Sequence, residues 1–245
     1  MINVLFGLPT HSCIIWLIIT RGGIASEFFI LNLSICEIGN CVSCIFAVLI
    51  HWILSLKTLA LTLFGLFFAG RPLFHCLMCV ERYLAVVHPV TFLKYKPLRY
   101  KGISSAAAWI VCLGSCLCCL LLFEYYMIAY MVLFSTMFIL FLSIQLLCCL
   151  AVLRALKQSG PGERGREREE ENHMKRRAFH LILITTVSMV IAYIPYAVLG
   201  FFAVMTSHVI KVFWLIGLIC FVLCGFVQPV LYLNRAGKLN CLCST

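Results

Sequence analysis

Long apolar runs separated by short polar stretches dominate the pattern along this chain. Seven runs stand out, at about residues 5–19, 26–50, 53–87, 103–123, 125–156, 175–205 and 209–233. Most of them reach the roughly 20 residues that an α-helix needs to cross about 30 Å of hydrocarbon. The pattern therefore predicts an all-α membrane protein in which residues 1–245 form one seven-transmembrane helix bundle with a short amphipathic C-terminal segment.

Two parts of the apolar pattern have unusual lengths. Residues 103–156 are almost continuously apolar, and a single helix of that length would extend about 80 Å, so we expect the chain to reverse near Phe123 to Tyr126. The first run is short and has few residues before it. Either the amino terminus is clipped or the first helix begins at Met1.

Composition supports the membrane assignment, and the basic residues predict an orientation. Hydrophobic residues make up 63% of the 245 positions and charged residues 11%, with a mean hydropathy of +1.06, outside the soluble range. Lysine and arginine gather after the first, third, fifth and seventh runs, at 21, 94–101, 154–177 and 235–238. Because such connections stay in the cytoplasm, we expect an outer amino terminus and a cytoplasmic carboxyl terminus. This rule also accounts for the net charge of +10, so no nucleic-acid partner is expected.

The connection before the sixth run is polar and rich in helix breakers. Ser159-Gly160-Pro161-Gly162 is followed by a highly charged stretch at 163–173. We expect a cytoplasmic loop there, either disordered or a frayed extension of the next helix. This loop is either a contact segment for a cytoplasmic partner or a solvated linker.

Most of the sixteen cysteines lie inside the apolar runs, where thiols pack as small hydrophobic groups rather than as a disulfide framework. The cluster Cys116-Leu117-Cys118-Cys119 has no second ligand pair, so no metal site is expected. Cys241 and Cys243 differ, because they follow a basic segment just after the last run. They are either lipidation sites or plain exposed thiols.

A charged triplet, Glu81-Arg82-Tyr83, follows about 25 mostly apolar residues and marks a predicted exit from the membrane. An arginine at this position keeps its aliphatic stem among apolar groups and its guanidinium free for backbone carbonyls or a docking partner. The alternative is that these charges are ordinary anchors at the end of a spanning helix.

Six local signatures occur in order along the predicted helices. They are Gly7-Leu8-Pro9-Thr10-His11, Asn32-Leu33-Ser34-Ile35-Cys36-Glu37, Glu81-Arg82-Tyr83 with His88-Pro89, Trp109, Ala192-Tyr193-Ile194-Pro195-Tyr196, and Gln228-Pro229-Val230-Leu231-Tyr232. Together they resemble the rhodopsin-like (class A) G-protein-coupled receptors over nearly the whole chain. The connection Val87-His88-Pro89-Val90 is similar to that of the purinergic and protease-activated branch.

The resemblance implies a plasma-membrane receptor that sits among membrane lipids, with no enzymatic activity and no cofactor. Its outer half would bind an extracellular ligand, and its inner half would open to a heterotrimeric G protein as the sixth helix swings outward. The coupling and switch residues would be Glu81, Arg82, Tyr83, Tyr193, Pro195, Pro229 and Tyr232. Each of the two prolines removes a backbone hydrogen bond and is expected to kink its helix, unless it is simply tolerated there.

The chain also departs from the family pattern. Tyr193 stands where the family usually has tryptophan, and Lys57 stands where the cysteine of its outer disulfide is found. No acid lies near the base of the sixth helix, so a lock on Arg82 would have to use Glu81 or the acids at 169–171. These departures favour an alternative, a truncated or degenerate receptor-like membrane protein that does not signal.

The ligand class is poorly defined by the sequence. Phe64 stands where amine receptors carry an aspartate, and Val222 where opsins carry the retinal lysine, so both classes are disfavoured. The predicted upper pocket is aromatic and apolar, with Phe64, Tyr196, Phe201 and Trp214, accompanied by Phe202. This composition fits a hydrophobic ligand and also fits ordinary core packing.

Three ionisable residues are expected at one depth in the bundle. Counting 1.5 Å per residue from the inner ends places His11, Glu37 and Arg71 about 15 to 17 Å deep, with Gln228 about a turn below. An unpaired charge there costs at least about 2.5 to 3.5 kcal/mol, so we expect a Glu37–Arg71 ion pair with His11 hydrogen-bonded nearby. In the resembled family a sodium ion occupies this level. The guanidinium would take its place, and no sodium site is expected.

Overall fold

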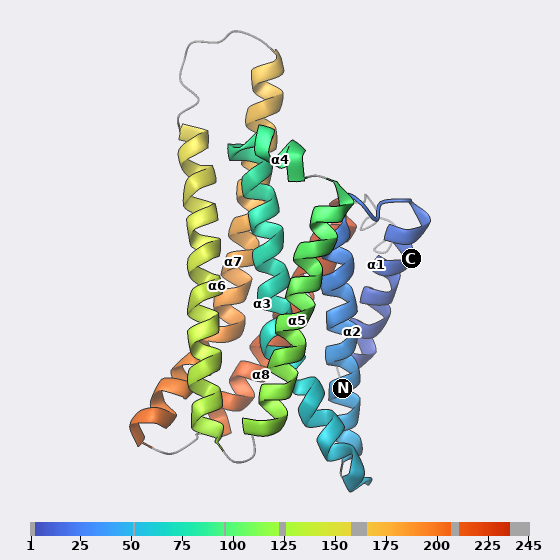
Figure 1. The fold of residues 1–245 in the computed structure, drawn as a ribbon, viewed down its shortest axis with the longest axis vertical. Coiled ribbons are helices and arrows are strands. Elements are labelled where there is room, and N and C mark those ends of the chain that lie inside the picture. Colours follow the sequence, from blue (N-terminus) through green and yellow to red (C-terminus); the bar gives the residue numbers. More distant parts are fainter. Residues whose placement is uncertain are drawn as a thin grey trace.

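The computed structural model of this chain describes residues 3–50, 52–95, 97–122, 126–157, 166–206 and 211–235. In this part of the chain all regular elements are helices, which confirms the predicted all-α fold (Figure 1). The elements are η1 (Asn3–Gly7), α1 (Leu8–Thr20), α2 (Phe28–Leu49), η2 (Leu54–Leu56), α3 (Lys57–Val87), α4 (Pro89–Tyr95), α5 (Leu98–Leu122), α6 (Met127–Lys157), α7 (Arg166–Thr206), α8 (Lys211–Gly225) and α9 (Val227–Arg235).

Six helical stretches of the described chain are long and apolar enough to cross a membrane, as expected of a multi-pass membrane protein. They are Phe28–Leu49, Leu54–Val87, Leu98–Leu122, Ile128–Lys157, Lys175–Phe202 and Ile216–Asn234. The first predicted span corresponds to a shorter apolar helix, Val4–Thr20. The chain reverses between Leu122 and Met127, at the predicted joint.

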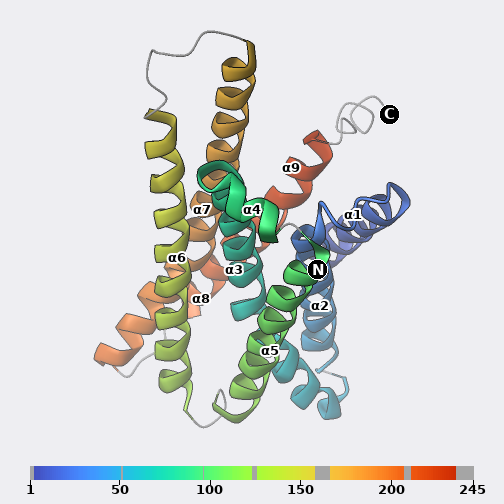
Figure 2. The same cartoon turned by 45° about the horizontal axis from the view of Figure 1, so that its top comes forward.

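Helix α3 lies at the centre of the bundle and contacts α2, α5, α6 and α7 (Figures 1 and 2). Small residues allow its close approach to α5. A Cβ atom added at Gly65 would lie 2.3 Å from the Cα atom of Cys116, and Ser115 donates a hydrogen bond to the Gly65 carbonyl at 3.2 Å. The two backbones are therefore in direct contact, as small residues permit between membrane helices.

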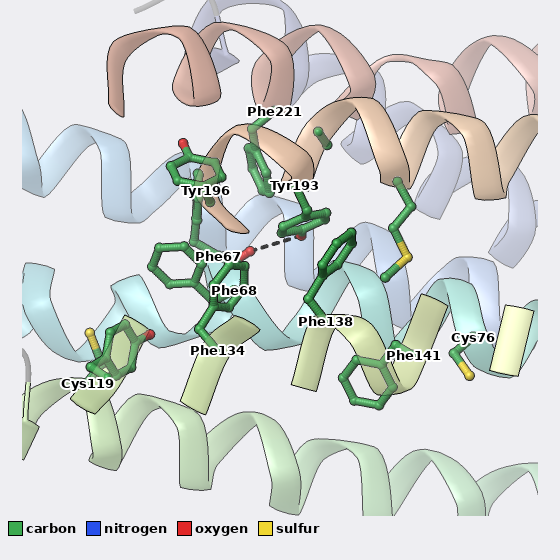
Figure 3. Packing of buried hydrophobic residues seen from close by; sticks show 13 residues of the cluster. Phe67, Phe68, Cys76, Cys119, Phe134, Phe138, Phe141, Tyr193, Tyr196 and Phe221 are labelled. Carbon is green, nitrogen blue, oxygen red and sulfur yellow. Dashed lines mark hydrogen bonds between the residues drawn. The ribbon is translucent and has the colours of Figure 1, made fainter. Parts of the chain in front are cut away.

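The main core of the bundle is a cluster of aromatic side chains from α3, α6, α7 and α8 (Figure 3). Phe67 stacks on Phe221 with ring centroids 3.7 Å apart, and its ring also meets the edge of Tyr196 at 5.8 Å. The rings of Phe68 and Phe134 meet edge to face, with centroids 4.3 Å apart. Aromatic contacts of this kind join the four helices through ring packing.

The helix near the carboxyl terminus is broken rather than continuous over 209–233. Helix α8 ends at Gly225 and α9 begins at Val227, with the Phe226 amide donating to the Leu223 carbonyl at 3.2 Å in place of the usual helical bond. Pro229 has no amide hydrogen to offer the Gly225 carbonyl, so the ladder cannot close across this point. The helix is interrupted at Phe226, three residues before the proline.

Two further boundaries differ from the sequence prediction. Helix α7 begins at Arg166 and is 41 residues long, so much of the stretch 163–173 is the helix extension that was one of the two alternatives. The connection after α3 contains a short helix, α4, which the sequence pattern did not indicate. The amphipathic C-terminal segment lies after Arg235 and is outside the described residues, as are Cys241 and Cys243.

Candidate functional site

A cavity of about 50 Å³ lies at the inner end of the bundle, the end at which α3 and α6 finish and α5 and α7 begin. Three of the predicted site residues, Arg82, Gln228 and Tyr232, meet in its wall. The complete lining is Ile30, Met78, Cys79, Arg82, Leu181, Ile182, Thr185, Gln228, Leu231 and Tyr232. The cavity is thus a largely apolar pocket between α2, α3, α7 and α9 with one guanidinium at its edge.

The Arg82 side chain is half-buried and has no ion pair or hydrogen bond to any residue that the structure describes. Its neighbour Glu81 points elsewhere, because the Glu81 carboxylate contacts the Lys101 ammonium at 2.5 Å. Glu81 therefore does not form the predicted lock with Arg82 in this structure. The side chains at 169–171, the other acids considered for this role, are outside the description.

Tyr83, the third member of the charged triplet, faces away from the cavity. Its hydroxyl group lies 2.9 Å from Nε2 of His88, and the two rings meet edge to face with centroids 5.5 Å apart. His88 caps the end of α3, directly before α4. Tyr83 therefore supports the turn between the two helices instead of lining the pocket with Arg82.

Glu37 of α2 and Arg71 of α3 form a buried ion pair, with side-chain exposures of 3% and 4%. Arg71 donates from Nε to Oε1 at 2.5 Å and from Nη2 to Oε2 at 2.7 Å. Its remaining nitrogen, Nη1, donates to the Phe221 carbonyl at 2.6 Å, and Cζ lies 3.5 Å from the centroid of the Phe221 ring. Each of the three guanidinium nitrogens therefore donates a hydrogen bond, which is the geometry that such a buried charge needs.

The two other residues expected near this level contact groups outside the ion pair. His11 is buried, and its Nδ1 atom is 3.5 Å from the Ser34 hydroxyl rather than in a hydrogen bond with Glu37 or Arg71. Gln228 lines the inner cavity instead. The third hydrogen bond of Arg71 goes to the Phe221 carbonyl, a backbone group whose availability no residue type signals.

Tyr193, one of the predicted switch residues of α7, lies in the aromatic core. Tyr193 is completely buried, and its hydroxyl group donates to the Phe67 carbonyl at 3.2 Å (Figure 3). Its ring packs against Phe138 and Phe221, with centroids 5.5 and 5.7 Å away. Pro195 lies inside the same helix, two residues further on. Tyr193 thus links α7 to the α3 backbone beside the helix position that proline weakens.

The described residues of the predicted upper pocket lie in two different environments, and two of them show the core packing that was the alternative. Phe64 stacks on Phe67 at 5.3 Å and Tyr196 is buried, so both belong to the core. Phe201, in contrast, is 57% exposed. Five residues along a helix correspond to a rotation of about 140°, which puts Tyr196 and Phe201 on different faces of α7. The Trp214 side chain is outside the description.

A second cavity, of about 170 Å³, opens between α3, α5 and α6. Its lining is almost entirely apolar and consists of Phe68, Ala69, Val111, Ser115, Cys118, Tyr130, Leu133, Phe134 and Met137. Val111 and Leu133 are both exposed, so the cavity opens sideways and not toward either end of the bundle. The sequence pattern gave no indication of it.

Sequence reasoning also missed two buried basic side chains. Lys101 is 7% exposed and contacts both Glu81 and the Ala25 carbonyl. His75 is 4% exposed, and its Nδ1 atom has no hydrogen-bond partner within the described chain. Lys101 was counted among the cytoplasmic charges and His75 was not considered, since neither belongs to a recognisable motif.

Comparison with known proteins adds no assignment. No family model matches the chain, and no curated protein matches it with significant similarity. Among the residues that the structure describes, no group of three or more histidine, cysteine, aspartate or glutamate side chains is placed to hold a metal ion. The candidate site is therefore defined by the inner cavity and by the buried ion pair.

Proposed function

We propose that this protein is a seven-helix G-protein-coupled receptor of the rhodopsin-like type, located in the plasma membrane. The observation that carries the proposal is the guanidinium of Arg82 at the edge of the inner cavity, without a partner among the described residues. The order of the six sequence signatures supports the same reading. In this proposal the shorter helix Val4–Thr20 is the first span and brings the total to seven, and the inner cavity faces the cytoplasm.

The mechanism would use the elements that surround the cavity. Leu181, Ile182 and Thr185 of α7 form one wall, and Pro195 lies further along the same helix. A change in the bend of α7 at Pro195 moves this wall away from Arg82 and enlarges the cavity. A segment of a heterotrimeric G protein would then enter and meet the guanidinium, which offers several hydrogen bonds to carbonyl groups.

The test is the Arg82→Ala variant in a panel of G-protein dissociation assays, with pooled extracellular ligands. Coupling should be abolished, while the amount of protein at the cell surface should stay within about twofold, because a half-buried residue at a helix end contributes little to packing. Arg99→Ala is the matched control, since Arg99 is an exposed arginine near the same end. Coupling that survives Arg82→Ala, or that Arg99→Ala abolishes equally, would contradict the proposal.

A second candidate is a receptor-like membrane protein that does not signal. It is favoured by the aromatic cluster, in which Phe67, Phe221 and Tyr196 pack together where a ligand pocket was expected. The two candidates differ in one result. A non-signalling protein reaches the surface normally but shows no G-protein dissociation with any ligand pool, and Arg82→Ala then changes nothing.

A further inference from the structure

The ammonium group of Lys101 joins three parts of the chain at the inner end of the bundle. Lys101 lies in the first turn of α5, and its Nζ atom is 2.5 Å from Oε1 of Glu81 on α3. The same atom donates to the carbonyl of Ala25, at 2.9 Å, in the connection between α1 and α2. Both charged side chains are largely buried, with exposures of 7% and 14%. The ion pair is therefore a largely buried, charge-assisted hydrogen bond and not a surface ion pair. We call the contacts of Lys101 with Glu81 and Ala25 the joint.

The joint determines which cation Glu81 contacts. Adjacent residues on a helix point about 100° apart, so Glu81 and Arg82 leave α3 in different directions. Glu81 points toward α5, whereas Arg82 points toward the cavity bounded by α7 and α9. If the charge of Lys101 were removed, the Glu81 carboxylate would be free to turn toward Arg82, its neighbour in the chain, because both side chains have flexible stems.

We propose that Lys101 is a positioning residue for Arg82. By holding the Glu81 carboxylate on the α5 side of α3, it keeps the Arg82 guanidinium unpaired at the cavity and open to a cytoplasmic partner. This inference rests on the proposed function, in which Arg82 meets the G protein. It assigns to Lys101 a regulatory role that depends on its charge and not only on its contribution to packing.

The experiment measures how fast phenylglyoxal modifies Arg82 in membranes that contain the full chain, by mass spectrometry of the Arg82 peptide. Lys101→Gln removes the charge but keeps a donor for the Ala25 carbonyl. We expect it to slow the modification of Arg82 by about two- to fivefold, the range of a partly exposed ion pair. Arg99 in the same sample is the internal reference, and Lys101→Arg should keep the wild-type rate.

The double variant Lys101→Gln/Glu81→Gln separates positioning from mere structural support. It lacks the joint but also lacks the carboxylate that would capture Arg82, so the rate should return to the wild-type value. A rate that stays slow would mean that losing the joint distorts the site, and would overturn the proposal. An unchanged rate in Lys101→Gln would overturn it as well.

The Glu81→Gln single variant gives a test that does not require a Lys101 variant to fold. Arg82 should react at the wild-type rate, because Glu81 does not restrain it in the unmodified protein. A rate increase of more than about twofold would show that the two residues already pair, and the proposal would fail. The assay contains no G protein. A slowed Arg82 rate in Lys101→Gln with unchanged coupling would therefore contradict the proposed role of Arg82 in coupling and leave the positioning role intact.

Discussion

Arg71 donates to both carboxylate oxygens of Glu37, at 2.5 and 2.7 Å, and thereby joins α3 to α2 in the interior of the bundle. Its third bond reaches the Phe221 carbonyl on α8. One side chain thus holds three helices at one level. Since a membrane interior offers no water to replace these bonds, the stability of the bundle should depend strongly on this pair.

The first prediction concerns the loss of one partner. Arg71→Ala leaves the buried Glu37 carboxylate without a counter-charge, which should cost about 3 to 5 kcal/mol and lower the amount of folded protein at the cell surface. Surface labelling and thermal unfolding of the purified protein measure the effect. Adding Glu37→Gln to Arg71→Ala should restore much of the loss, because the orphaned charge is gone. Full surface expression of the single variant would show that the pair contributes little.

The second prediction concerns sodium. The guanidinium of Arg71 lies against Glu37 and supplies the positive charge that this carboxylate needs. The midpoint of thermal unfolding should therefore be the same in equal concentrations of sodium and potassium chloride, apart from the common effect of ionic strength. A rise in midpoint that sodium causes and potassium does not reproduce would show that a cation site exists beside Glu37.

The third prediction tests the contact between α3 and α5. A Cβ atom at Gly65 would lie 2.3 Å from the Cys116 backbone, so Gly65→Ala should push the two helices apart and destabilise the protein by about 1 to 3 kcal/mol. Gly114→Ala on α5 is the control, because a Cβ there meets nothing within 4 Å. That change should be neutral or stabilising, by up to about 1 kcal/mol. Equal unfolding midpoints for the two variants would refute the close contact.

The fourth prediction concerns orientation. The basic residues near the inner end of the bundle predict that the connection between α6 and α7 is cytoplasmic. An epitope inserted between Gly160 and Gly162 should therefore be detected by antibody only after the cells are permeabilised. An epitope appended before Met1 serves as the control and should be accessible on intact cells. Detection of the internal epitope on intact cells would reverse the proposed topology.

The sequence predicted the helices well because apolar length is a strong local signal. The reversal after Leu122 followed from the impossibility of an 80 Å helix, about twice the thickness of a bilayer. The contact between Glu37 and Arg71 followed from depth and charge, since two opposite charges buried at one level have few other partners. Both arguments use properties that single residues carry.

What the sequence could not provide depends on side-chain direction and on backbone groups. Lys101 looked like one more cytoplasmic charge, and only the packing of α5 against α3 turns it toward Glu81. Phe201 was placed with Tyr196 by proximity along the chain, although their positions on the helix differ in rotation. The Phe221 carbonyl has no signature in the sequence, because every residue carries the same group.

The length of α7 has a mechanical consequence. From Arg166 to Pro195 the helix continues without a break over about 44 Å, so a bend at the proline would turn this portion as one rod. On such a rod, a tilt of about 10° at Pro195 displaces the tip at Arg166 by about 8 Å. The α7 wall of the inner cavity lies between pivot and tip, and it moves by a smaller amount. A small change in bend near the aromatic core would therefore produce its largest displacement at the Arg166 end of α7.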